Sequence, residues 1–217
     1  MGAGRPKQYL PLQNQSVIFH TLSRLAQLPG LKAILVGISA DDPYWSSLRE
    51  LTHALPCPVI KYEGGVSRAE TVARGLKRIA GEAGANDWVL VHDAVRPCVQ
   101  IDDIRKLIEQ VGHDTDGGLL ALPVSDTLKS ERDGRSLQTV DRTHLWRALT
   151  PQYFPLRLLA TAIDAAMKKG VDITDEASAM ELNGVRPRLV VGRADNIKIT
   201  YPSDLLLAEH ILKQQGL

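Results

Sequence analysis

The stretch Trp88-Val-Leu-Val-His-Asp-Ala-Val-Arg-Pro97 indicates how the chain folds. It opens with an apolar run rich in valine and leucine, and helical patterns flank it, as is typical of a buried parallel strand. The strand must end before Pro97, because proline cannot donate to a β-ladder. Ligands of open α/β sheets bind beyond the carboxyl ends of the strands, so we expect Asp93 to lie where a metal ion or a phosphate can reach it. An ordinary strand exit with a solvated aspartate explains this stretch equally well.

Further apolar runs and amphipathic segments alternate along the chain. The runs that predict strands are 33–38, 58–62, 118–124 and 188–192, and the segments that predict helices begin near Ser16, Pro43, Ser67, Asp102, Leu156, Thr174 and Pro202. Alternating strands and helices are typical of an α/β fold. We therefore expect one domain over residues 1–217, with a mostly parallel sheet and helices on both of its faces.

One segment interrupts this alternation. Residues 125–142 contain two short strand-like stretches around Asp133-Gly134, a dipeptide typical of a tight hairpin turn. No helical segment follows that would cover such a hairpin, so we expect it to pack on something else, such as a second subunit. After this arm, Thr150-Pro151-Gln152 is expected to be a loop.

A glycine pair follows the second predicted strand. Gly64 and Gly65 permit a tight turn close to a ligand, and Ser67 with Glu70 forms a capping-box pattern that opens a helix. The amino terminus of a helix is a natural site for an anion. A plain strand-to-helix turn remains the simpler interpretation of this spacing alone.

Composition excludes several classes of protein. The chain has 217 residues, 44% hydrophobic and 24% charged, and a net charge of +1, which does not favour binding to nucleic acid. Two cysteines, Cys57 and Cys98, cannot form a disulfide framework and suit a reducing compartment. We find neither an apolar run long enough to span a membrane nor a signal-peptide pattern, so we expect a cytoplasmic protein without a membrane partner.

Charged and hydroxyl side chains gather near the predicted strand ends. They are Asp93, Arg96, Thr127, Arg142, Thr150, Asp195 and Lys198. Arginine and lysine bind phosphates, and a carboxylate among them can hold Mg²⁺. Hydrolase motifs and zinc-ligand spacings are lacking, and we interpret His92 as a structural ring rather than a general base. This set of residues therefore indicates a polyanionic substrate.

Eight short motifs carry a resemblance to a known family. In chain order they are Pro6-Lys-Gln-Tyr9, Gly64-Gly-Val-Ser-Arg68, Val91-His-Asp-Ala-Val-Arg-Pro97, Asp126-Thr127, Thr139-Val-Asp-Arg142, Leu149-Thr-Pro-Gln152, Thr174-Asp-Glu-Ala-Ser178 and Ala194-Asp-Asn-Ile-Lys-Ile-Thr200. Together they resemble the 2-C-methyl-D-erythritol 4-phosphate cytidylyltransferase family across essentially the whole chain. The resemblance implies a Rossmann-like nucleotidyltransferase fold, a homodimer and Mg²⁺. It also implies that CTP and methylerythritol phosphate give the CDP-sugar alcohol and pyrophosphate, on the non-mevalonate route to isoprenoids.

The resemblance also implies roles for individual residues. Catalysis would involve Lys7, Arg142 and Lys198, and the nucleotide would contact Gly64, Gly65, Thr71, Asp93 and Ala94. The substrate would contact Arg96, Thr127, Arg142, Thr150, Thr174, Asp195 and Lys198. Asp93 would bind the metal. Thr127 and Arg142 would reach across the dimer into the partner's site. The attacking phosphate is largely dianionic near neutral pH, so alignment and charge neutralisation matter more than a general base.

The chain differs from the family pattern at its start. That pattern opens with an apolar strand and a glycine-rich loop that includes an arginine, and Met1 aligns with the methionine that ends the loop. We expect the lack of these parts to leave two sheet edges exposed, to weaken folding and to weaken or abolish transfer. Two other functions remain open: a cytidylyltransferase for another polyol phosphate such as ribitol 5-phosphate, and an inactive nucleotide-binding dimer.

Overall fold

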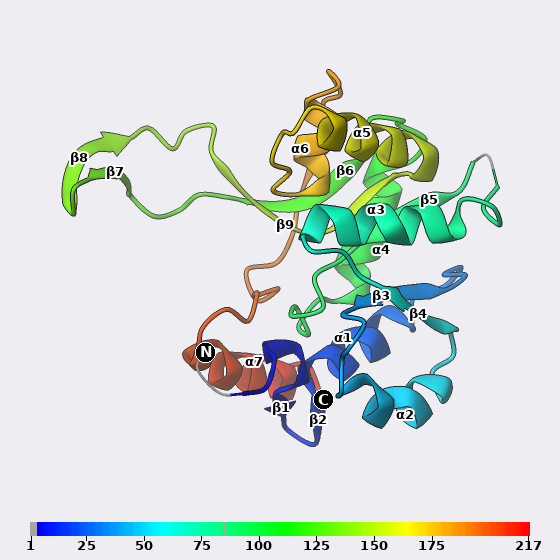
Figure 1. Ribbon diagram of the computed structural model, residues 1–217. Helices are drawn as coiled ribbons and strands as arrows, with labels where there is room; N and C mark the ends of the chain where they lie inside the picture. Colours follow the sequence, from blue (N-terminus) through cyan, green and yellow to red (C-terminus); the bar gives the residue numbers. More distant parts are fainter. Residues whose placement is uncertain (1–3, 85) are drawn as a thin grey trace.

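Two sheets carry the body of the computed structural model, which describes residues 4–84 and 86–217 (Figure 1). The larger sheet has the order β10-β6-β9-β5, formed by Arg188–Val191, Gly118–Pro123, Trp146–Pro155 and Trp88–Val91. The smaller sheet pairs β3 (Ile34–Ile38) with β4 (Val59–Glu63). A short ribbon pairs β1 (Pro11–Leu12) with β2 (Gln15–Ser16). The α/β class expected from the sequence is confirmed.

The expected mostly parallel sheet is wrong in one respect. β10 runs parallel to β6 and β3 parallel to β4, but β9 runs antiparallel to both β5 and β6, so the larger sheet is mixed. β5 is accordingly half-buried and antiparallel to its neighbour rather than a buried parallel strand. Its Val-rich run indicated a strand correctly, but composition does not specify the direction of the partner.

The expected loop at Thr150–Gln152 lies inside β9. Pro151 suggested a loop because it lacks an N–H, yet β9 continues through it with a register shift against β6 between Leu119 and Ala121. Such a bulge leaves residues outside the regular ladder and redirects their side chains. The irregular part of β9 therefore lies next to the end of β5, where Gln152 pairs with Val91.

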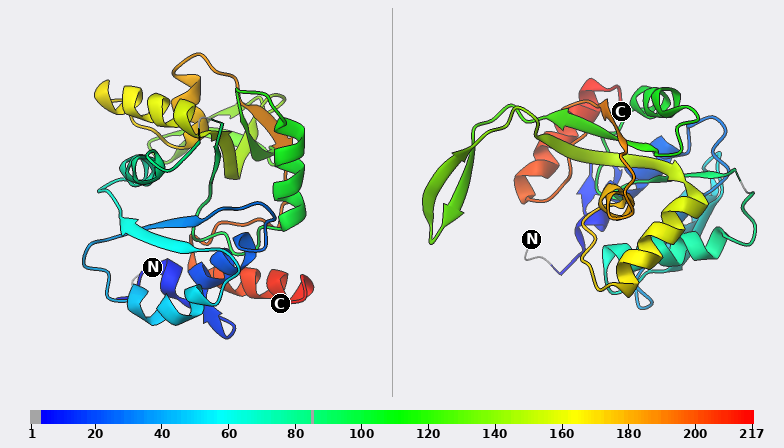
Figure 2. Two further views of the ribbon diagram at one scale, coloured as in Figure 1. Left: turned by 90° about the vertical axis from the view of Figure 1, so that its right-hand side faces the viewer. Right: turned by 90° about the horizontal axis from the view of Figure 1, so that it is seen from above.

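The two sheets are not joined by strand pairing in the described ranges. β3 pairs with β4 alone, and β5 pairs with β9 alone, so each has one edge without a strand partner. Figure 2 shows the β3–β4 sheet below the larger sheet in its left view. Separate apolar clusters pack around each sheet, and the chain between β5 and α4 passes from one to the other.

Helices lie on both faces of the larger sheet, as expected, with α3 (Arg68–Ile79), α5 (Leu156–Lys168) and α6 (Glu176–Glu181) on one face and α4 (Ile101–Val111) on the other (Figure 2). Of the remaining helices, α1 (Val17–Leu25) and α2 (Arg49–His53) pack around the β3–β4 sheet, and α7 (Pro202–Gln214) packs beside β1. Leu119 and Phe154 pack with α3, α5 and α6, whereas the neighbouring Leu120 and Tyr153 pack with α4. This alternation is that of a sheet covered on both sides. The helix expected over 43–54 is shorter, because a 3₁₀ turn at Trp45–Leu48 precedes α2.

The hairpin arm projects from the body, as Figure 1 shows. Strands β7 (Leu128–Arg132) and β8 (Arg135–Val140) pair antiparallel around the predicted turn. Asp133 and Gly134 both have positive φ, 52° and 74°, as a tight hairpin turn of this type requires. Most side chains of β8 are exposed, so the arm has no core of its own.

Among the described residues, the structure contains no helix that is long and apolar enough to cross a membrane.

Candidate functional site

Asp93 stands two residues beyond β5 at the centre of a charged cluster. Its Oδ2 lies 3.1 Å from Arg96 Nε and 3.2 Å from Lys198 Nζ, and its Oδ1 lies 3.5 Å from Arg68 Nε. The carboxylate is largely buried, with 11% of its side chain exposed. Burial by itself raises the pKa of this carboxyl, but the three cations outweigh it and lower the pKa of Asp93 to about 2. Asp93 is therefore a fixed negative charge, and a solvated strand exit is not what the structure shows.

Arg96 joins this cluster to the last predicted motif. Its Nη1 donates to the carbonyl of Asn196 at 2.8 Å, and the amide of Asn196 donates to the carbonyl of Thr150 at 2.8 Å. Both Arg96 and Asn196 are buried. Lys198 follows two residues later and contacts Asp93 with a side chain that remains 44% exposed. Three segments distant in sequence thus meet where β5 ends, as the sequence led us to expect.

Arg68 is a site residue that the sequence analysis did not select. It begins α3, and its guanidinium forms two hydrogen bonds with the Glu176 carboxylate, of 2.6 and 2.9 Å, while its Nε faces Asp93. Glu176 is 1% exposed, so Arg68 is the counter-ion of a buried carboxylate. The quoted motif Gly64–Arg68 contained the signal, because an arginine at a helix start is unfavourable for the helix dipole and needs another reason.

The glycine pair forms the turn into α3. The N–H of Gly64 donates to the carbonyl of Ile38 at the end of β3, and the N–H of Gly65 donates to Thr71 Oγ1 at 2.9 Å. A Cβ on Gly65 would lie 2.4 Å from the Glu70 side chain, so the turn requires glycine there. Ser67 caps the helix as predicted, but Glu70 accepts from Val66 N–H rather than from the N-cap. Thr71 thus braces the turn that precedes the helix.

The half-buried His92 contacts both the Thr150 side chain and the backbone of Arg96. Its Nδ1 is 2.9 Å from Thr150 Oγ1 and its Nε2 is 3.2 Å from the Arg96 carbonyl oxygen. Thr150 Oγ1 also accepts from the Asp93 N–H at 3.1 Å. Burial lowers the pKa of His92 to about 4, so the ring is neutral at pH 7. A neutral, half-buried ring bonded at both nitrogens agrees with our interpretation of His92 as structural.

The segment before α6 lies beside the same region. Asp175 caps α6 with a capping box to Ser178, while the predicted site residue Thr174 is exposed one position earlier. The buried Gln152 donates to Asp175 at 2.8 Å and accepts from the N–H of Ala177 at 2.8 Å. These bonds attach the start of α6 to β9. Glu176 then continues into the pair with Arg68.

Lys7 begins a short 3₁₀ turn, Lys7–Tyr9, and is half-buried. Tyr9 anchors this turn, because its ring is buried and its hydroxyl donates to Asp42 at 2.9 Å. Within residues 4–84 and 86–217, no hydrogen bond or ion pair joins Lys7 to Asp93. Ala94, by contrast, is fixed beside the cluster, where its carbonyl accepts from the buried Thr21 hydroxyl at 3.0 Å.

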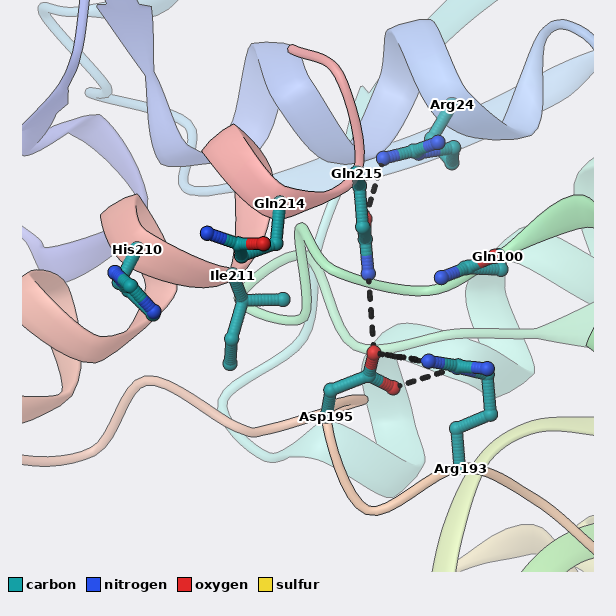
Figure 3. Close-up of a pocket in the computed structure, with 8 residues that line it drawn as sticks. All are labelled: Arg24, Gln100, Arg193, Asp195, His210, Ile211, Gln214 and Gln215. Atoms are coloured by element: carbon teal, nitrogen blue, oxygen red, sulfur yellow. Dashed lines mark hydrogen bonds and ion pairs between the residues drawn. The ribbon is translucent and has the colours of Figure 1, made fainter.

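Asp195 lies apart from the Asp93 cluster, although it was expected with it. Its carboxylate accepts hydrogen bonds from Arg193 Nε, at 2.9 and 3.2 Å, and from Arg193 Nη2, at 2.8 Å. Figure 3 shows this pair at one side of a pocket of about 440 Å³, with Arg24 and Gln215 opposite. His210, Ile211 and Gln214 of α7 also line this pocket, whereas Lys198, three residues after Asp195, contacts Asp93 instead.

The predicted residues of the arm are also separate from the cluster. Thr127 and Arg142 are exposed at the two ends of the hairpin, and in the described part of the chain Arg142 forms no ion pair. A single chain therefore brings Asp93, Ala94, Arg96, Thr150 and Lys198 together but leaves Thr127 and Arg142 outside.

The metal prediction depends on few protein ligands. Over the described residues, no group of three or more His, Cys, Asp or Glu side chains could hold a metal ion. Among the residues that the structure describes, Asp93 Oδ1 has only the 3.5 Å contact with Arg68, which leaves this oxygen available to another cation. Mg²⁺ often binds through one or two carboxylates together with substrate phosphates and water. Asp93 fits such a site once a nucleotide supplies the other ligands.

Fold and site together define a class of protein. A Rossmann-like α/β body, a glycine turn before a helix start, and a carboxylate among three cations at a strand end are the features of a nucleotidyltransferase. The family model for 2-C-methyl-D-erythritol 4-phosphate cytidylyltransferase matches residues 1–214. The chain belongs to this family, a family of CTP-dependent cytidylyltransferases.

Curated relatives and solved structures agree. The enzyme of that name from Tolumonas auensis is 48% identical over 219 residues, covering 100% of this chain and 92% of the relative. The one from Vibrio atlanticus is 48% identical, covering 99% and 90%. A crystal structure of 4-diphosphocytidyl-2C-methyl-D-erythritol synthase has a TM-score of 0.86 at 39% identity, covering 95% of this chain and 94% of that one. The Francisella tularensis enzyme has a TM-score of 0.83 at 34% identity, with 95% and 93% covered.

Proposed function

We propose that the Asp93 cluster is where this chain transfers the cytidylyl group of CTP to 2-C-methyl-D-erythritol 4-phosphate and releases pyrophosphate. One observation carries this assignment: a buried carboxylate surrounded by Arg68, Arg96 and Lys198 at the end of β5. The nucleotide would lie against Gly64, Gly65 and Thr71 at the start of α3. Two polyanions repel each other, and this cluster offers the cations that would hold them together.

The proposed chemistry needs no general base in the protein. A phosphate monoester has a second pKa of about 6 and is largely dianionic at pH 7, so it attacks the α-phosphorus of CTP without losing a proton. The leaving group is pyrophosphate, which carries the electron pair of the broken P–O bond. Lys198 and Arg142 would bind the attacking phosphate, and Lys7 would stabilise negative charge on the transferring group. His92 is half-buried and bonded at both ring nitrogens, and it has no part in proton transfer.

Mg²⁺ is part of this proposal. Asp93 would hold it together with oxygens of the CTP phosphates, and the ion would supply charge neutralisation on those phosphates when bound. Arg96 and Lys198 hold the carboxylate in place through its other oxygen. Thr150, Thr174 and Asp195 were expected as substrate contacts, and Thr150 is the one whose hydroxyl lies at the cluster.

We further propose a homodimer formed through the arm of residues 125–142. The arm exposes apolar side chains, since Leu137 is 58% and Trp146 at its base 37% exposed. An isolated two-stranded hairpin is marginally stable in water, so a partner surface would stabilise it. Thr127 and Arg142 would then enter the partner's site. The buried free thiols of Cys57 and Cys98 support a reducing, cytoplasmic location.

Pyrophosphate release tests the assignment. The purified chain is supplied with CTP and Mg²⁺, and with either 2-C-methyl-D-erythritol 4-phosphate or ribitol 5-phosphate. We expect release with the first substrate and little with the second. Faster release with ribitol 5-phosphate would contradict the substrate. CTP binding without release on either substrate would favour the inactive nucleotide-binding dimer.

A further inference from the structure

His92 lies inside the loop that carries Asp93, and every polar atom of its ring has a partner. The residue follows Val91, the last residue of β5, and its half-buried ring lies between this loop and β9. Nδ1 lies 2.9 Å from the Thr150 hydroxyl and Nε2 lies 3.2 Å from the Arg96 carbonyl oxygen. The Thr150 hydroxyl oxygen in turn lies 3.1 Å from the backbone nitrogen of Asp93.

The donors and acceptors fix where each proton lies. A carbonyl oxygen only accepts, so Nε2 must carry the hydrogen that faces Arg96. The Asp93 N–H donates to the Thr150 oxygen, which leaves the hydroxyl proton for His92 Nδ1. The bonds then form one directed chain: Asp93 N–H to Thr150 O–H to Nδ1, and Nε2–H to the Arg96 carbonyl. Only the neutral Nε2–H form of the ring completes this chain.

We propose that His92 is a positioning residue, which sets the geometry of Asp93 and Arg96 by accepting from Thr150 and donating to Arg96. The proposal rests on the proposed function, because Asp93 is taken as the residue that meets CTP. His92 is one ring that holds both ends of the loop: the Asp93 amide through Thr150, and the Arg96 carbonyl directly. The Arg96 and Asp93 side chains that project from these backbone atoms contact each other at 3.1 Å.

The bulge in β9 explains why Thr150 can take part. The register shift of β9 against β6 lies beside Thr150, whose side chain turns to the end of β5. The Thr150 carbonyl accepts from Asn196, whose own carbonyl accepts from Arg96. A side chain whose role was only to fill space would not need hydrogen bonds at its ring nitrogens. The bonds at both nitrogens therefore indicate orientation of a neighbouring group, as outer partners of metal ligands do.

Matched substitutions at His92 separate its two bonds. Asparagine places an amide oxygen near the position of Nδ1, so His92→Asn retains an acceptor for Thr150. Glutamine places an amide nitrogen near the position of Nε2, so His92→Gln retains a donor for Arg96. His92→Leu retains neither. We expect kcat to fall about 100-fold in His92→Leu and about 10-fold in each amide variant, while KM for methylerythritol phosphate changes little.

Thr150 provides a second pair of variants. Thr150→Ser keeps the hydroxyl that faces Nδ1, whereas Thr150→Val removes it at nearly equal volume. Combined with His92→Leu, Thr150→Val should add little to the loss, because one chain of bonds is already broken. Fully additive losses in a folded double variant would mean that the two residues act independently and would overturn the proposal.

Nitrogen NMR of the imidazole reads the arrangement without any turnover. We expect the neutral ring with hydrogen on Nε2 in wild type, and a shifted Nδ1 signal in Thr150→Val but not in Thr150→Ser. Hydrogen on Nδ1, or kcat unchanged in a folded His92→Leu enzyme, would overturn the positioning role alone. If wild type neither binds CTP nor releases pyrophosphate while the ring has hydrogen on Nε2, the proposed function is wrong and the positioning role falls with it.

Discussion

The Asp93 cluster and the hairpin arm are opposites in how their charges are held. In the cluster, Asp93 contacts three cations of its own chain, and 11% of its side chain is exposed. On the arm, Arg142 is exposed and forms no ion pair within the residues that the structure describes. A charge that already has counter-ions is oriented before any ligand binds. A charge without them acquires its geometry only from something outside the chain.

This difference separates preorganisation from assembly. The cluster is joined to β5, β9, α3 and the loop before α7, so its geometry is a consequence of folding. The arm is a two-stranded ribbon with exposed side chains, and such ribbons are marginal in isolation. We infer that variants of the cluster change the chain itself, whereas variants of the arm change what the chain does with a partner.

Asp93→Asn should produce the largest effect. The substitution keeps size but removes the charge that three cations share and the proposed ligand of Mg²⁺. We expect kcat/KM to fall about 10³-fold and the free energy of unfolding to fall by about 3 kcal/mol, because the buried Arg96 loses its counter-ion. Pyrophosphate release and urea denaturation measure these. Tighter CTP binding with unchanged turnover would show that the carboxylate only forms ion pairs with the cations and takes no part in the reaction.

Removing Arg68 should test the cluster as a structural unit. Arg68→Leu leaves the carboxylate of Glu176, which is 1% exposed, without its two hydrogen bonds, and should cost about 3 kcal/mol of stability. The double variant Arg68→Leu with Glu176→Leu should recover most of this loss. Arg135→Ala on the exposed arm is the matched control, and its effect should stay within about 0.5 kcal/mol. Equal losses of stability in Arg68→Leu and Arg135→Ala would contradict the difference between the cluster and the arm.

What the sequence predicts best in both regions is local. The Asp133-Gly134 turn, the Asp175 or Thr174 cap and the position of Asp93 after a strand follow from neighbouring residues alone. What it misses depends on pairing across the chain. Arg68 and Glu176 are separated by 108 positions, and neither side chain reveals its partner from its neighbours. The direction of β9 and its passage through Pro151 are decided by β5 and β6, so no local pattern indicates them.

Arg142→Ala should separate activity from stability. Because the side chain is exposed, unfolding should be unchanged within about 0.5 kcal/mol, while kcat/KM for methylerythritol phosphate should fall about 100-fold through loss of a proposed phosphate contact.

Mixing two inactive variants tests whether the arm serves the partner's site. If Arg142 completes the partner's site, heterodimers of Arg142→Ala with Asp93→Asn contain one intact site. Refolding the two together in equal amounts should therefore restore about a quarter of wild-type activity. No recovery in mixtures shown to contain heterodimers would place Arg142 in the site of its own chain.

Acid should weaken the cluster region through His92. Burial lowers the pKa of His92 to about 4, below its ordinary value of 6.5. The unfolded chain then binds a proton that the folded chain does not, so this stability is present above pH 6.5 and is lost as the pH falls towards 4. We expect the lowered pKa of His92 to make the free energy of unfolding about 2 kcal/mol smaller at pH 5 than at pH 8. Urea titrations at both values should show a smaller decrease in His92→Gln, and equal decreases would contradict the assignment.

The smallest effect should come from the turn of the arm. Gly134 has φ of 74°, a conformation that costs alanine about 1 kcal/mol. Gly134→Ala should therefore speed amide exchange in β7 and β8 about fivefold and weaken the proposed dimer, while global unfolding of the body is unchanged. Asp133→Asn is the control, since asparagine accepts the positive φ of 52° at that position. Because the arm has no core, its stability should be measurable separately from that of the cluster. A decrease in global stability as large as the local one would mean that arm and body unfold as one unit.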